Sequence, residues 1–156
     1  MNIFVLDSNI QKCAEYHVDK HVVKMILESA QILSTVSRLN GLDQGYKSTH
    51  EKHPCTIWTG ESIQNWNWLK MLAYHLNEEY KYRFDHTDNH KSYDLIQSLD
   101  DPALPNIGLT NFKIALPKYC IVQNNTIESY RKYYLKEKNH IFKWTKRSVP
   151  NWIIQT

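Results

Sequence analysis

Glycine, proline and long apolar runs are all scarce in this sequence of 156 residues, which contains four glycines and five prolines. No apolar run approaches the length that crosses a membrane, and the apolar start Ile3–Leu6 is too short for a secretory signal peptide. The three cysteines are odd in number and widely spaced, which indicates reduced thiols rather than a disulfide framework. We therefore expect one globular domain, residues 1–156, in the cytoplasm and without a membrane partner.

Familiar catalytic motifs are missing as well. The sequence has no glycine-rich phosphate-binding loop, no dinucleotide-binding fingerprint and no Gly-x-Ser-x-Gly turn. These absences exclude kinases, dehydrogenases and hydrolases of the usual kinds, and no cofactor is expected.

The longest uninterrupted stretch runs from Asn9 to Arg38, and the first glycine or proline is Gly41. Its closely spaced apolar residues predict one long, largely buried helix. At 100° per residue, a narrow polar stripe runs down this helix between apolar side chains. The stripe consists of His17, Lys20, His21, Lys24 and Glu28. Polar groups on a mostly buried helix need partners, so we expect the stripe to line a cleft and to supply the catalytic residues.

Another interpretation of the stripe stays open. It can be the one solvent-facing side of a core helix, with Lys24 and Glu28 as an ordinary i,i+4 pair. Asp19 is a further catalytic candidate, but on a straight helix it points away from the stripe. It can act there only if the helix breaks or starts late.

Two kinds of chemistry compete at this helix. If burial shifts their pKa values toward neutrality, the carboxylate and the imidazoles can perform acid–base catalysis, and a desolvated lysine can form a Schiff base. A zinc site is the alternative, built from Cys13, His17 and His21 with His50, His53 or Cys55 of the following loop. Because this spacing is not a strong zinc signature, we expect no metal and assign His50 and His53 to substrate binding.

The C-terminal segment is basic and aromatic. Residues 131–156 carry seven Lys and Arg against the single carboxylate of Glu137, a net charge of +6 on a chain whose total is +3. Such a segment suits a polyanion such as DNA, with aromatic rings for stacking and cations for phosphates. The candidate DNA contacts are Lys143, Trp144, Lys146, Arg147 and Trp152. The alternative is a solvated terminal helix with ordinary lysines.

The rest of the chain is mostly helical in pattern. Helices are predicted at 61–84 and 93–99, over one or two turns between Thr110 and Leu116, and from Thr126 onward, with a polar loop at 41–55. We expect a mainly α fold, with a long N-terminal helix at its centre and an irregular C-terminal tail.

Two segments carry a resemblance. Cys-Ala-x-x-His-x-Asp-Lys-His-Val-Val-Lys-Met at Cys13–Met25 and His-Pro-Cys-x-x-Trp at His53–Trp58 resemble those of small phage-type proteins similar to pyrimidine-dimer DNA glycosylases. The resemblance implies an all-helical enzyme that excises a damaged pyrimidine from DNA. In that family an amine attacks the sugar C1′, an imine forms, and a carboxylate assists β-elimination.

The sequence departs from the family pattern at both catalytic elements. The family nucleophile is the α-amine of a Thr exposed by removal of the initiator Met, whereas here the bulky Asn2 favours retention of Met1. The family glutamate follows an Ala-Glu-Tyr-Arg run, whereas here Val18 follows Ala14–His17 and the nearest carboxylate is Asp19. We expect a DNA glycosylase or lyase. Base modification of phage DNA and a non-catalytic phage factor that binds a nucleotide or a host protein are the alternatives.

Overall fold

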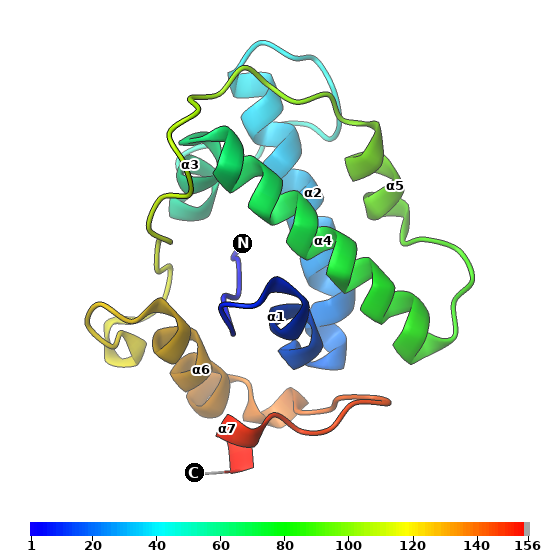
Figure 1. The fold of residues 1–156 in the computed structure, drawn as a ribbon, viewed down its shortest axis with the longest axis vertical. Helices are drawn as coiled ribbons and strands as arrows, with labels where there is room; N and C mark the ends of the chain where they lie inside the picture. Colours follow the sequence, from blue (N-terminus) through cyan, green and yellow to red (C-terminus); the bar gives the residue numbers. More distant parts are fainter. Residues whose placement is uncertain (155–156) are drawn as a thin grey trace.

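The computed structural model describes residues 1–154, and within this range the chain folds into helices without a β-sheet (Figure 1). The helices are α1 Ile10–Tyr16, α2 Asp19–Leu39, α3 Pro54–Gly60, α4 Ile63–Phe84, α5 Lys91–Ser98, α6 Thr126–Glu137 and α7 Asn151–Ile154, with 3-10 turns η1 Lys118–Cys120 and η2 Asn139–Ile141. The mainly α fold predicted from the sequence is confirmed. None of the described helices is long and apolar enough to span a membrane.

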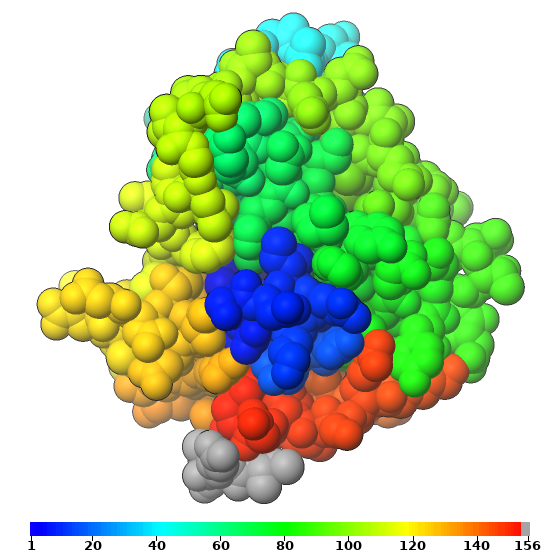
Figure 2. Space-filling model, viewed as in Figure 1, coloured from blue at the N-terminus to red at the C-terminus, as the bar shows by residue number. Residues whose placement is uncertain are grey.

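Helices α2 and α4 form the centre of the fold. They pack against each other, α3 and α5 pack against α2, and α1 packs against α4. In Figure 1, α4 crosses in front of α2 and the C-terminal segment runs beneath them. Figure 2 shows the blue N-terminal segment at the surface between α4, in green, and the red C-terminal segment.

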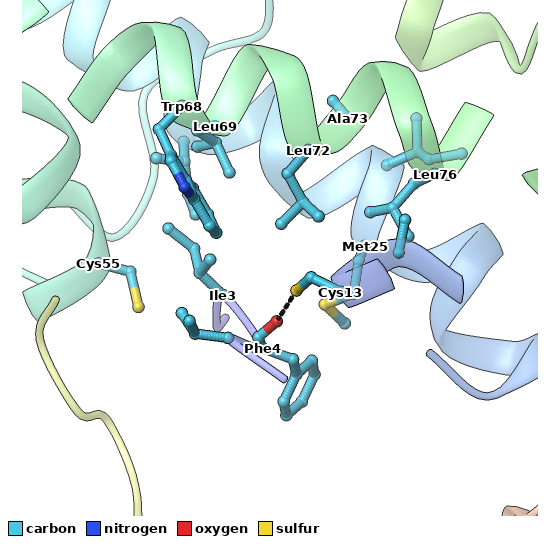
Figure 3. Close-up of a cluster of buried hydrophobic side chains, with 14 of the residues drawn as sticks. Ile3, Phe4, Cys13, Met25, Cys55, Trp68, Leu69, Leu72, Ala73 and Leu76 are labelled. Atoms are coloured by element: carbon cyan, nitrogen blue, oxygen red, sulfur yellow. Dashed lines mark hydrogen bonds between the residues drawn. The ribbon is translucent and has the colours of Figure 1, made fainter. Parts of the chain in front are cut away.

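Residues 1–8 form an extended arm that enters the core. Ile3, Phe4, Val5 and Leu6 are all buried. Figure 3 shows Ile3 among side chains of α4, and the Phe4 carbonyl accepts a hydrogen bond from the Cys13 thiol at 3.2 Å. The short apolar run Ile3–Leu6 forms no β-strand. Burial of the arm carries the Met1 end of the chain into the interior.

The single helix predicted from Asn9 to Arg38 is wrong, because the chain breaks between α1 and α2. His17 and Val18 have extended backbones, with ψ of 133° and 155°. The three carbonyls that end α1 are satisfied by side chains from far along the sequence. Arg83 donates to the carbonyls of residues 15 and 17, and Trp144 donates to that of residue 16, at 2.7 to 2.8 Å. A helix end with its carbonyls paired in this way needs neither glycine nor proline.

Other boundaries match in part. Helix α6 begins where it was predicted, whereas α4 begins two residues later and α5 two residues earlier than expected. The turns predicted between Thr110 and Leu116 are absent, and α3 was not predicted. His53 caps α3 by accepting from the Cys55 backbone N–H, and Pro54 fills the first turn, where no amide proton is needed.

Candidate functional site

The terminal amine of the chain meets a carboxylate in the interior. Met1 N lies 3.1 Å from Glu28 Oε1, and the side chains of Met1 and Glu28 are 3% and 10% exposed. Met1 as a whole is only partly buried, so its exposed surface lies on the main chain. The second carboxylate oxygen, Glu28 Oε2, is buried and has no hydrogen-bond partner in the described chain. The amine of a partly exposed residue thus lies beside a carboxylate with one free acceptor.

Asn2 holds this amine in place. Its Oδ1 accepts from the Ile3 backbone N–H and from the Tyr130 hydroxyl, both at 2.8 Å. Its Nδ2 donates to the Ala115 carbonyl at 3.0 Å. The Cys55 thiol lies 3.7 Å from the same Oδ1, which brings the start of α3 to the amine. The side chain that follows Met1 therefore fixes the direction of the chain end.

The loop before α3 brings two imidazoles to the same region. The rings of His50 and His53 are 6.4 Å apart and nearly perpendicular. Burial lowers the pKa of His53, and the charges of the Met1 amine and His50 lower it further, whereas Glu28 acts in the opposite direction. Of the candidate site residues, Glu28 thus contacts the amine, His53 lies within reach of its charge, and His50 lies beside His53.

The two histidines of the stripe lie in the core instead. His17 Nδ1 is 2.7 Å from the Cys13 carbonyl, and its Nε2 is buried without a described partner. His21 stacks on Phe4 at 4.5 Å, and its Nδ1 is 2.7 Å from the Tyr134 hydroxyl. Burial lowers the pKa of His17 to about 4 and that of His21 to about 3. Both rings are therefore neutral packing groups at pH 7.

These neutral rings predict acid sensitivity. Unfolded histidine titrates near pH 6.5, so below that pH the unfolded chain binds more protons than the folded one. Stability is retained above pH 6.5, and the free energy of unfolding then falls toward pH 4 by up to about 1.4 kcal/mol per pH unit for each ring. His21→Phe keeps a ring stacked on Phe4 and should remove one ring's share of this slope. Urea unfolding followed by Trp fluorescence at a series of pH values measures it, and an unchanged slope in the variant would contradict the assignment.

The other charged candidates on α2 do not lie together. Lys20 and Lys24 are exposed on α2. Asp19 is nearly buried, and its Oδ1 accepts from Arg83 at 3.2 Å and from the Thr145 backbone N–H at 2.9 Å. Asp19 therefore ties the C-terminal segment to the start of α2, away from the amine.

Most of the aromatic and basic tail is engaged within the chain. Trp144 and Trp152 are buried, and the Trp144 indole donates to the Tyr16 carbonyl at 2.8 Å. Lys146 pairs with Asp85, and Arg147 pairs with Glu79 at 2.6 Å. Lys143 is exposed and its side chain has no ion pair in the described chain. These contacts pack the tail against α1 and α4 rather than presenting it as a stacking platform.

Within residues 1–154, no group of three or more His, Cys, Asp or Glu side chains is placed to hold a metal ion. Cys13 is buried, and burial raises the pKa of its thiol to about 11, which disfavours the thiolate that zinc needs. The Cys13, His17 and His21 set is interrupted by the break between α1 and α2.

Sequence reasoning missed two parts of this site. The amine itself was left without a position, because a polar Asn2 before the apolar run Ile3–Leu6 does not by itself indicate a buried, hydrogen-bonded chain start. The second is Thr35, whose hydroxyl holds the backbone of Thr49 and so fixes the histidine loop. A threonine two helical turns after Glu28 does not by itself indicate that its hydroxyl binds the backbone of a distant loop.

One comparison with known proteins found a match. A family model described as pyrimidine dimer DNA glycosylase matches residues 1–92, more than half of the chain. The matched region includes the amine, Glu28 and both loop histidines. Neither the curated proteins nor the solved structures gave a match.

Proposed function

The chain belongs to the pyrimidine dimer DNA glycosylase family, and from this premise we propose that it excises a damaged pyrimidine from DNA with the Met1 α-amine as nucleophile and Glu28 as the assisting carboxylate. Membership gives a function of the DNA glycosylase type with DNA as the partner. The finer assignment, a glycosylase that is also a lyase, is the proposal, and so is a cytoplasmic site of action. The observation that supports Met1 as the nucleophile and Glu28 as the assisting carboxylate is the 3.1 Å contact between Met1 N and Glu28 Oε1.

The proposed reaction uses both oxygens of Glu28. The uncharged amine attacks C1′, the C1′–N bond to the damaged base breaks, and the base leaves with the bonding pair. Opening of the sugar ring gives an imine; loss of a C2′ proton then expels the 3′ phosphate. Oε1 is placed to take the proton that the ammonium must lose, and Oε2 is free to exchange a proton with the sugar.

Exposed cations on α2 and in the loop before α3 support a DNA-facing surface on these two segments, which also carry Glu28 and His53. Lys20 and Lys24 lie on the exposed side of α2, and Lys52 precedes His53 in the loop. None of the three has a carboxylate partner within residues 1–154. Lysines without an internal partner can neutralise phosphates and release counterions on binding. We therefore place the DNA on this face, and not on the tail that holds Lys146 and Arg147.

Glu28→Gln tests the chemistry. The change keeps the shape of the side chain but removes its charge, so the single-turnover excision rate should fall by roughly 10²- to 10⁴-fold, as expected for loss of an acid–base group. DNA affinity should be nearly unchanged. The measurement is borohydride trapping and strand cleavage on a duplex that holds one pyrimidine dimer, with binding followed by fluorescence anisotropy.

The matched control is Glu51→Gln, which removes an exposed carboxylate from the loop before α3 and should leave the rate unchanged. Full activity in Glu28→Gln would show that the carboxylate has no catalytic part.

A further inference from the structure

The loop from Thr49 to His53 has a fixed conformation. Thr35 Oγ1 accepts from the Thr49 backbone N–H at 3.1 Å, and its single proton is shared between the carbonyls of Gln31 at 2.8 Å and Thr49 at 3.1 Å. Thr35 follows Glu28 by two helical turns and shares its side of α2. His50 has a φ of +50°, a left-handed backbone that few residues other than glycine adopt and that costs conformational energy. Thr35 holds the chain on one side of His50, and the cap of α3 holds it on the other. The backbone conformation of His50 therefore determines where His53 lies.

The hydrogen bonds of His53 determine which of its nitrogens can meet a substrate. Nδ1 accepts from the Cys55 backbone N–H at 3.1 Å, so a neutral ring carries its proton on Nε2. Nε2 has no described hydrogen bond and the residue is only half-buried. His53 therefore presents an N–H donor, and not a base, beside the amine.

The surroundings keep this donor uncharged. Burial lowers the pKa of His53, and the groups whose charges act on it are the Met1 amine, His50 and Glu28. A neutral ring does not repel the ammonium or compete with it for Glu28. It can still donate to an anionic oxygen, and the oxygens nearest to C1′ of a nucleotide in a DNA strand that carry charge are those of its phosphate.

Resting on the proposed function, we propose that His53 is a substrate-positioning residue whose Nε2–H donates to a phosphate oxygen of the nucleotide that the Met1 amine attacks. The ring then holds the sugar at a set distance from the amine. His50 orients the loop, and His53 makes the contact.

A pair of variants separates this contact from the capping role of His53 in α3. His53→Ala removes both the cap and the donor. His53→Asn keeps a side-chain oxygen that caps helices well but has no N–H at the position of Nε2, because its amide nitrogen lies closer to the backbone. We expect His53→Asn to melt at the temperature of the unaltered chain and to bind dimer-containing DNA roughly tenfold or more weakly, as for loss of one hydrogen bond to a charged group. His53→Ala should show the same loss of affinity with a lower Tm. If His53→Asn restores both affinity and Tm, the residue is only a cap and the proposal fails.

The salt dependence of binding gives a second readout. A neutral donor displaces no counterion, so the slope of log affinity against log salt should be the same in His53→Asn and in the unaltered chain. Lys24→Ala is the matched comparison and should lower that slope by about one. A slope lowered by the same amount in His53→Asn would show a charged ring and overturn the neutral-donor assignment. Anisotropy does not depend on the chemical step, so failure of the unaltered chain to form a trapped adduct would remove the catalytic proposal while these affinities still decide the role of His53.

Discussion

Acetylation of the Met1 amine is expected to abolish the covalent adduct that borohydride traps between this protein and dimer-containing DNA. The acetyl group removes the lone pair that attacks C1′ and breaks the contact with Glu28, which at 3.1 Å is the ion pair that places the amine. Loss of a nucleophile is among the largest single effects on an enzyme, and we expect the trapping rate to fall on the order of 10³-fold or more. The acetylated chain can be made with an N-terminal acetyltransferase and compared with the free chain by gel shift after reduction.

A second form of the chain controls for charge. One residue added before Met1 keeps a positive amine but moves it away from Glu28, so this chain should also fail to form the adduct. Thermal melting of both forms shows whether the arm still packs. Undiminished trapping by the acetylated chain would instead point to a lysine, and loss of the adduct in Lys20→Ala or Lys24→Ala would then identify it.

The sequence allowed much of the helical fold to be predicted, because α4 and α6 bury apolar residues at helical spacing. The break between α1 and α2 could not be predicted, since no local signal marks it. It depends on Arg83 and Trp144, which are more than 60 residues away and reach the carbonyls of α1 only in the folded chain. Helix α3 was missed for a different reason: its seven residues are too few for a periodic pattern, and its histidine cap is a weak signal.

The candidate site divides in the same way. Glu28 follows from the sequence, because a carboxylate on a largely buried helix requires a partner. Its partner, the Met1 amine, could not be identified from a sequence pattern, because every chain has a terminal amine. The amine becomes a candidate only because the burial of Ile3–Leu6 brings it to Glu28. The projection of Asn9–Arg38 as one straight helix also placed His17 on the same side as Glu28, whereas the break between α1 and α2 places His17 in the core.

Arg83 is the structural centre that the break requires. Its side chain is fully buried and makes four hydrogen bonds, to Glu79 Oε1, Asp19 Oδ1 and the carbonyls of Glu15 and His17, at 2.7 to 3.2 Å. Two of these partners are nearly buried carboxylates. A buried guanidinium is stable when most of its five N–H donors are paired, and here four hydrogen bonds reach groups of α1, α2 and α4.

We expect Arg83→Met to lower the free energy of unfolding by about 3–5 kcal/mol, because two nearly buried carboxylates each lose one charged donor and two helix-end carbonyls lose their donor. Lys81→Met is the matched control: it removes an ion pair with Glu78 from the surface of the same helix and should cost about 1 kcal/mol or less. Urea denaturation at neutral pH measures both. In the double variant Arg83→Met, Asp19→Asn, the loss of unfolding free energy should be smaller than the sum of the two single losses, because the two residues share one contact. A double-mutant cycle measures this coupling. Equal, small losses in Arg83→Met and Lys81→Met would contradict the assignment and would require that the end of α1 is held by Trp144 alone.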